Sequence, residues 1–167
     1  MNTGALPEKP LEEKTSDRIP SLGRLIFFVG LIISAYDSAV LRQGKFDLRG
    51  VGMLGVALFI VGLCLYFVSR LTLGRFFSEA IRIKPEHKLI TSGPYRFIRH
   101  PIYLGEILYF LSIPMIFGSI YGFIVMLVLV PMLIHRIGVE ERALVSKLGK
   151  DYIEYTQRTK KLIPCIY

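Results

Sequence analysis

A polar run between two apolar stretches carries the residues whose types and spacing can do chemistry. Residues 87–106 combine cations, aromatic rings and turn formers, and they lead directly into an apolar segment. Charged side chains at the mouth of a membrane segment are costly, and they mark places where something charged is bound. His100 precedes Pro101, which suits the first turn of a helix, so Arg99 and His100 are expected at a helix N-terminus. Backbone donors there favour anions, so the run predicts a site for a carboxylate or phosphate.

The same run also offers aromatic faces and a carboxylate. Tyr95 and Tyr103 can present their rings to a cation. Glu106 lies one turn into the apolar segment, and it is interpreted as a ligand contact, as a partner for Arg99, or as a member of an interfacial ion pair. Spacing alone leaves another account open, in which Arg99 and His100 only extend to lipid headgroups.

A second group of candidates follows the last apolar stretch. Arg136 and Glu140 are four residues apart, so they share one face of a helix, and Glu141 is next to them. An arginine can clamp an acceptor carboxylate through two hydrogen bonds, and a neighbouring carboxylate can accept from cofactor hydroxyls or pair with an ammonium. An ordinary ion pair on a helix has the same spacing. No metal site is expected, because the sequence has no zinc-ligand spacing. It also has no catalytic-triad pattern and no glycine-rich phosphate loop.

The composition indicates a protein that lies in a membrane. Of 167 residues, 52% are hydrophobic, which is above the norm for globular chains, and they are clustered. The net charge of +8 alone is compatible with nucleic-acid binding. The cations, however, flank the apolar runs as membrane anchors do. We therefore expect an integral membrane protein that contacts membrane lipids and binds no nucleic acid.

The apolar runs predict an all-α fold with about four transmembrane helices. They cover residues 22–41, 51–71, 102–117 and 120–137. The first two meet the length of about 20 residues that spans a bilayer. The last two are joined only by Gly118 and Ser119, so they are expected to form a tight helical hairpin. Leu144, Leu148, Tyr152 and Tyr155 then recur at helical spacing, which predicts an amphipathic C-terminal helix over residues 139–158.

These elements suggest three regions along the chain. Residues 1–20 are expected to be a flexible tail, residues 21–72 two transmembrane helices, and residues 73–167 the region that binds a cofactor and carries catalysis. The cations gather before the first run, in the long middle loop and after the last run. The positive-inside rule then predicts a multi-pass protein whose N- and C-termini and cofactor loop are cytoplasmic.

Two sets of motifs resemble a known family. The loop contains His87-Lys88-Leu89-Ile90, Ser92-Gly93-Pro94-Tyr95 and Arg99-His100-Pro101-Ile102-Tyr103. The C-terminal part contains Arg136, Glu140, Glu141, Leu144, Gly149, Tyr152 and Tyr155, followed by Leu162-Ile163-Pro164. Over roughly residues 73–164, these motifs resemble the isoprenylcysteine carboxyl methyltransferase family in order and spacing.

The resemblance implies an integral membrane enzyme that uses S-adenosyl-L-methionine as methyl donor. It implies that Arg136 contacts the acceptor and Glu140 the cofactor, so both are expected in the catalytic centre. Arg99 and Glu141, next to these positions, are included in the expected cofactor site. The cofactor contacts that the resemblance implies are His87, Lys88, Leu89, Ile90, Tyr95, His100, Pro101, Ile102, Tyr103 and Glu140.

The expected acceptor is lipophilic, enters from the bilayer and carries a carboxylate, as an isoprenylcysteine does. A carboxylate is already ionised at neutral pH, so methyl transfer from a sulfonium needs alignment and exclusion of water rather than a general base. The loop also resembles phospholipid N-methyltransferases. It resembles sterol reductases that bind NADPH as well, although those usually carry Asn at the position of Ile102. A non-catalytic membrane module is a further alternative, and neither the acceptor nor the oligomeric state follows from the sequence.

Overall fold

The computed structural model describes residues 11–41, 50–74 and 89–163. Within these ranges the chain forms helices and turns and no strand, which confirms the all-α prediction. The helices are α1 (Leu11–Tyr36), α2 (Gly50–Leu73), α3 (Pro101–Phe117), α4 (Ile120–Leu127), α5 (Leu129–Leu148) and α6 (Lys150–Arg158). A π-helical turn (Asp37–Leu41) extends α1, and a 3-10 turn (Gly93–Arg96) precedes α3.

Within the part of the chain that the structure describes, three helical segments are long and apolar enough to cross a membrane. They are Ser21–Leu41, Gly50–Leu73 and Ile120–Leu148, the last of which combines α4 and α5. The apolar helix α3 has 17 residues, so it is about 26 Å long and somewhat shorter than the ~30 Å hydrocarbon core. The protein is therefore an integral membrane protein. Its described residues include three full-length spans and one shorter apolar helix, where the sequence predicts four spans.

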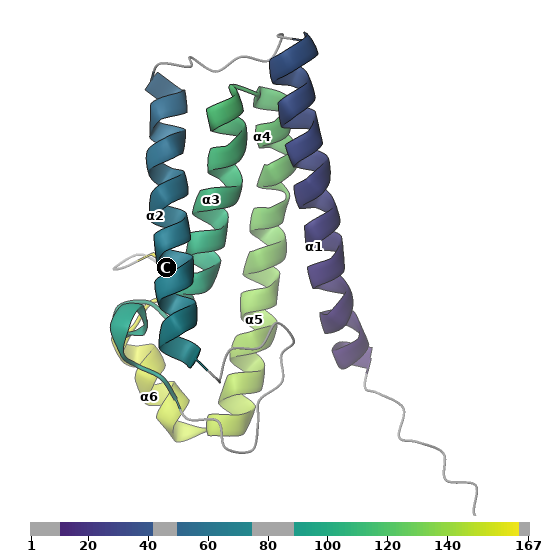
Figure 1. The fold of residues 1–167 in the computed structure, drawn as a ribbon. Coiled ribbons are helices and arrows are strands. Elements are labelled where there is room, and N and C mark those ends of the chain that lie inside the picture. Colours follow the sequence, from purple (N-terminus) through teal and green to yellow (C-terminus); the bar gives the residue numbers. More distant parts are fainter. Residues whose placement is uncertain (1–10, 42–49, 75–88, 164–167) are drawn as a thin grey trace, which may run out of the picture.

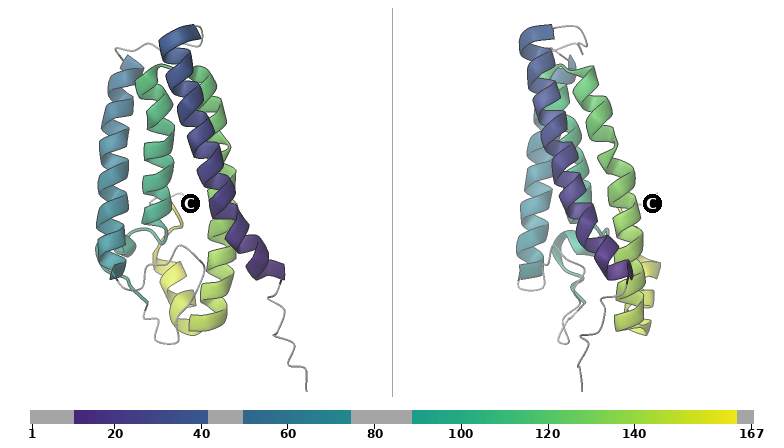
Figure 2. Two further views of the ribbon diagram at one scale, coloured as in Figure 1. Left: turned by 45° about the vertical axis from the view of Figure 1, so that its right-hand side comes forward. Right: turned by 90° about the vertical axis from the view of Figure 1, so that its right-hand side faces the viewer.

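Helices α1, α2 and α3 and the consecutive pair α4–α5 stand side by side (Figure 1). Small residues allow them to approach closely. Helix α2 packs against α3, and α1 packs mainly against α4. A Cβ atom added at Gly62 would lie 2.8 Å from the carbonyl oxygen of Gly105. Gly122 is in similarly close contact with Ser34 across α4 and α1. The turned views show α1 crossing the face of the bundle at a tilt (Figure 2). The glycines thus allow backbone-to-backbone contact, the usual basis of helix association in lipid.

The predicted helical hairpin is present between α3 and α4. Gly118 ends α3 in the left-handed conformation (φ 69°). The Ser119 hydroxyl accepts a hydrogen bond from the backbone N–H of Gly122 at 3.1 Å and so caps α4. The run 120–137 is not one uninterrupted helix, however, because it is broken at Val128. Pro131 has no N–H to donate to the carbonyl of Leu127, which explains why the break lies there.

The predicted amphipathic C-terminal helix is present as α6, but residues 139–158 do not form one continuous helix. Helix α5 continues to Leu148, the chain turns at Gly149 (φ 56°, ψ −124°), and α6 begins at Lys150. Glycine adopts this backbone conformation at no steric cost. Helix α1 also begins at Leu11, inside the segment predicted to be a flexible tail.

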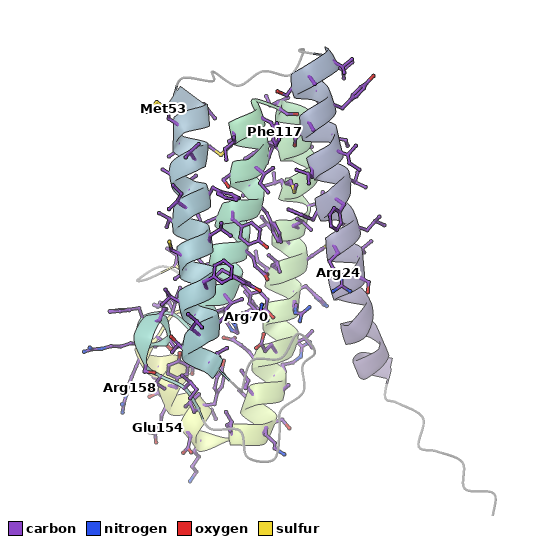
Figure 3. The ribbon with its side chains drawn as sticks, in the orientation of Figure 1. Arg24, Met53, Arg70, Phe117, Glu154 and Arg158 are labelled. Carbon is purple, nitrogen blue, oxygen red and sulfur yellow. The ribbon has the colours of Figure 1, made fainter. Side chains whose placement is uncertain are left out.

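The two ends of the bundle differ in character. Glu154 and Arg158 of α6 lie at the same end as Arg70 of α2, whereas Met53 and Phe117 lie at the opposite end (Figure 3). Along the sides, large apolar side chains of α1 and α2 are exposed, as a surface in contact with lipid requires. Residues 89–100, the start of α3, the end of α5 and α6 therefore meet at the polar end (Figure 1).

Candidate active site

The segment before α3 is joined to the segment after α6 through backbone hydrogen bonds. The N–H of Arg99 donates to the carbonyl of Lys160 at 2.8 Å, and the N–H of His100 donates to that of Lys161 at 3.0 Å. Ile98 and Lys160 form an isolated parallel bridge. The Tyr155 hydroxyl of α6 donates to the carbonyl oxygen of Tyr95 at 2.6 Å. Stretches about 60 residues apart in the chain thus form one layer beneath the membrane helices.

Glu141 holds this layer together through its charge. Its Oε1 lies 2.7 Å from Arg99 Nε and 3.4 Å from His100 Nε2, and its Oε2 lies 3.3 Å from Lys161 Nζ. The side chains of Arg99 and Glu141 are only 8% and 15% exposed. Arg99 also donates to the carbonyls of Thr156 and Thr159. We call Arg99, His100, Glu141 and Lys161 the ionic cluster.

The ionic cluster shows which carboxylate pairs with Arg99. Glu106 is one predicted partner for Arg99, but Arg99 pairs with Glu141. Glu106 lies three residues after Tyr103 on α3, near Tyr109, at the side of α3 where Tyr109 meets Tyr66 of α2. Arg99 instead donates to the carbonyls of Thr156, near the end of α6, and of Thr159, just after it.

Tyr103 joins the second group of candidate residues. Arg136 Nε donates to the Tyr103 hydroxyl at 2.9 Å, and that hydroxyl donates to Glu140 Oε2 at 2.8 Å. The Arg136 guanidinium carbon lies 5.9 Å from the centre of the Tyr103 ring. Arg136 and Glu140 share a face of α5 as predicted, and a phenol from α3 links them. We call these three residues the tyrosine relay.

The ionic cluster and the tyrosine relay adjoin each other at the first turn of α3. The ring centres of His100 and Tyr103 lie 5.7 Å apart. His100, Pro101 and Ile102 are buried there, between the two groups. Glu140 and Glu141 follow each other on α5, so the carboxylates of both groups come from the same helical turn.

Three buried tyrosines at this polar end are held in the neutral form. Burial and then the Glu140 carboxylate raise the pKa of Tyr95 well above its ordinary value. Burial and then Glu141 do the same for the pKa of Tyr152. Burial raises the pKa of Tyr155 to about 12. These phenols therefore remain hydrogen-bond donors at neutral pH.

Comparison with known proteins identifies the family. The sequence model of the isoprenylcysteine carboxyl methyltransferase (ICMT) family matches residues 54–146, which is more than half of the chain. The chain belongs to the ICMT family. The match runs from α2 into α5 and includes the whole tyrosine relay. The resemblance stated from the motifs is thereby confirmed.

Curated relatives agree with the ICMT assignment. Protein-S-isoprenylcysteine O-methyltransferase B of Arabidopsis thaliana is 32% identical over 115 residues, covering 67% of this chain and 58% of the relative. A probable protein-S-isoprenylcysteine O-methyltransferase of Oryza sativa subsp. indica is 34% identical over 119 residues, covering 70% and 62%. The chain therefore spans about six tenths of the length of these relatives.

A solved structure supports the same fold. It is the eukaryotic intramembrane Ras methyltransferase ICMT (isoprenylcysteine carboxyl methyltransferase), solved without a monobody. It superimposes with a TM-score of 0.69 at 25% identity, covering 88% of this chain and 52% of that chain. The helical arrangement of this ICMT-family chain thus matches about half of a known intramembrane protein.

The structure brings most of the predicted site residues to one place. Tyr95, Arg99, His100, Pro101, Ile102, Tyr103, Arg136, Glu140 and Glu141 belong to the two groups or to the segment that connects them. Leu89 and Ile90 are half-buried where the described loop begins. His87 and Lys88 lie outside the described residues. No group of three or more potential metal ligands occurs in the part of the chain that is described.

Sequence reasoning missed the contributions of α6 and of the segment after it. Tyr152 and Tyr155 enter that reasoning as apolar positions of a helix and as members of the C-terminal motif, but not as site residues. Lys161 enters only as one of many cations. The helical spacing of Tyr152 and Tyr155 correctly indicates a buried face. Nothing in that spacing indicates that their hydroxyls belong to the polar site.

Proposed function

We propose that the protein is an S-adenosyl-L-methionine-dependent membrane methyltransferase that methylates the carboxylate of a lipophilic acceptor of the isoprenylcysteine type. Membership of the ICMT family supports the reaction class. The observation that carries the assignment to residues is the tyrosine relay, in which one phenol holds Arg136 and Glu140 beside each other. An arginine and a carboxylate so fixed suit an anionic acceptor and a donor rich in hydroxyl and amine groups.

The donor set of this site fits the cofactor. Glu140 offers a carboxylate for ribose hydroxyls or an ammonium, and the rings of Tyr95 and Tyr103 suit a sulfonium, which is a cation. The cofactor, when bound, supplies an electrophilic methyl group. Arg136 would orient the acceptor carboxylate without protonating it, since a carboxylate is already ionised at neutral pH. Catalysis would then come from alignment and from exclusion of water.

The remaining candidates divide into two roles. His87, Lys88, Leu89, Ile90, Tyr95, His100, Pro101, Ile102 and Tyr103 are proposed to line the cofactor site with Glu140. For Arg99 and Glu141 we propose a positioning role, because their charged atoms already serve the ionic cluster. Their pairing would hold the loop so that the Tyr103 hydroxyl stays within hydrogen-bond distance of Glu140.

We further propose that the polar end of the bundle faces the cytoplasm, with both termini on that side. The end that carries α6 also carries the described loop with Arg96 and Arg99 and the segment with Lys160 and Lys161. Basic residues near membrane spans are retained on the cytoplasmic side. The cofactor would enter from the cytoplasm and the lipid-tailed acceptor from the bilayer.

Ligand stabilisation tests the cofactor first. Purified protein in detergent should unfold at a higher temperature with S-adenosylhomocysteine and be unaffected by NADPH. Stabilisation by NADPH alone would favour the reductase reading, and no response to either ligand would favour a non-catalytic module.

Methyl transfer then tests the acceptor. Protein supplied with S-adenosylmethionine carrying a radiolabelled methyl group should label N-acetyl-S-farnesylcysteine, and mild base should release the label as methanol. That release identifies a methyl ester. Base-stable label on phosphatidylethanolamine vesicles would instead identify an N-methyltransferase. Arg136→Ala is the control that should abolish labelling.

A further inference from the structure

The hydroxyl of Tyr152 is a buried polar group at the polar end of the bundle. The residue is 2% exposed, and its hydroxyl has no hydrogen-bond partner among the residues that the structure describes. Phenylalanine would fill the same space without a polar atom. A buried hydroxyl with no partner is unfavourable, so a partner from beyond these residues has to be found for it.

The surroundings of this hydroxyl connect it to the candidate site. The charges that act on it belong to Glu141, Arg99 and Glu140, in that order. These residues are the central ion pair of the ionic cluster and the carboxylate of the tyrosine relay. Tyr155, on the same face of α6, lies 5.9 Å away ring to ring and donates its own hydroxyl to Tyr95. The Tyr155 hydroxyl thus has a partner within the protein, whereas the Tyr152 hydroxyl has none among the described residues.

The kind of group that Tyr152 can bind follows from the charges around it. Arg99 and Glu141 are already paired with each other. A charged ligand group beside them would need its own counter-ion to offset its burial, whereas an uncharged acceptor atom needs only a donor. Burial and Glu141 raise the pKa of Tyr152, so its hydroxyl keeps its proton and is such a donor.

We propose that Tyr152 is a further cofactor contact, whose hydroxyl donates a hydrogen bond to an uncharged acceptor atom of the nucleoside. Ribose hydroxyl oxygens and purine ring nitrogens are acceptors of this type. The inference rests on the proposed function, because it assigns a contact to the cofactor of that reaction. Tyr152 would act in binding alone and would take no part in methyl transfer.

Removal of the two hydroxyls of α6 separates a ligand contact from a structural one. Tyr152→Phe should bind S-adenosylhomocysteine about three- to tenfold more weakly by calorimetry. Without ligand it should unfold at the same temperature as the wild type or higher, since it loses no protein partner. The matched control, Tyr155→Phe, should unfold at a lower temperature, because the backbone carbonyl oxygen of Tyr95 loses its hydrogen-bond donor.

A shorter ligand tests the assignment to the nucleoside. 5′-Methylthioadenosine lacks the amino-acid part, so Tyr152→Phe should weaken its binding by the same factor. Unchanged affinity of Tyr152→Phe for S-adenosylhomocysteine, a loss confined to that longer ligand, or a ligand-free protein destabilised like Tyr155→Phe would each overturn the inference. In all three cases a wild type that still binds S-adenosylhomocysteine leaves the proposed cofactor in place. A wild type that binds neither ligand would overturn both proposals.

Discussion

Arg99 and Glu141 are 42 residues apart in the chain, and their side chains meet at 2.7 Å in a largely buried ion pair. Arg99 comes from the segment that leads into α3, and Glu141 comes from the part of α5 at the polar end of the bundle. The pair therefore fixes the start of α3 relative to α5. Tyr103 lies on that first turn of α3 and Glu140 lies next to Glu141, so we expect the same pair to position Tyr103 against Glu140.

Loss of the Glu141 charge should destabilise the protein strongly. In Glu141→Gln the Arg99 guanidinium stays buried without a counter-ion, a change that typically costs about 3 kcal/mol. Thermal unfolding in detergent measures the shift. Glu154→Gln is the matched control, because Glu154 is exposed on α6 and its replacement should stay within about 0.5 kcal/mol. Equal melting temperatures for the two variants would show that the ionic cluster does not hold the loop.

The Tyr103 hydroxyl should matter for rate more than for folding. Tyr103→Phe keeps the ring and removes the atom that accepts from Arg136 and donates to Glu140. Misplacement of these two side chains should lower kcat about 100-fold. Initial rates of methyl transfer measure this, with Tyr121→Phe as control, since Tyr121 is exposed at the hairpin end. A Tyr103→Phe enzyme with the wild-type kcat would exclude the relay from catalysis.

Arg136 and Glu140 should separate in their effects on ligand binding. Both Arg136→Ala and Glu140→Ala should abolish turnover. Glu140→Ala should also weaken S-adenosylhomocysteine binding about tenfold or more, whereas Arg136→Ala should leave it within about threefold, because we assign Arg136 to the acceptor. Calorimetry on the purified variants checks the split. Normal cofactor affinity in Glu140→Ala would contradict the role given to Glu140.

Alkaline pH should unfold the protein through its buried tyrosines. Burial raises the pKa of Tyr155 to about 12, whereas tyrosine in an unfolded chain titrates near 10. The stability that the neutral phenol contributes is complete below about pH 10 and is lost as the pH rises from about 10 through about 12, because the unfolded chain ionises first. Unfolding temperatures across that window should fall more steeply for the wild type than for Tyr155→Phe. Parallel curves would mean that Tyr155 ionises equally in both states.

The sequence predicts local features of this protein well and long-range partners poorly. Hydropathy locates the spans, because a bilayer demands long apolar helices, and the Gly118-Ser119 pair marks the hairpin because glycine favours its left-handed turn. Gly149 carries the same kind of signal. The apolar spacing across it, continuous from Leu144 to Tyr155, nevertheless favours a single helix.

The partners of the site residues depend on packing that no local pattern encodes. Glu106 of α3 and Glu141 of α5 are both possible partners for Arg99 in the sequence. Arg99 pairs with Glu141 in the structure, where the segment after α6 also binds the backbone of Arg99 and His100. Likewise, the spacing of Arg136 and Glu140 predicts their shared helix face. It cannot predict that Tyr103, from another helix, comes to lie between them.

The glycine contact between α2 and α3 should be required for both stability and activity. A Cβ atom at Gly105 would lie 2.8 Å from the Gly62 carbonyl oxygen and 2.8 Å from the Tyr66 backbone nitrogen, so Gly105→Ala should push the helices apart. The expected cost is about 1–3 kcal/mol, which a lower unfolding temperature reports. Gly23→Ala is the control, because nothing lies within 4 Å of an added Cβ there and helix propensity should keep or raise its stability. Since α3 carries Tyr103, Gly105→Ala should also lower the rate of methyl transfer, and a variant as stable and active as Gly23→Ala would show that the two backbones can separate freely.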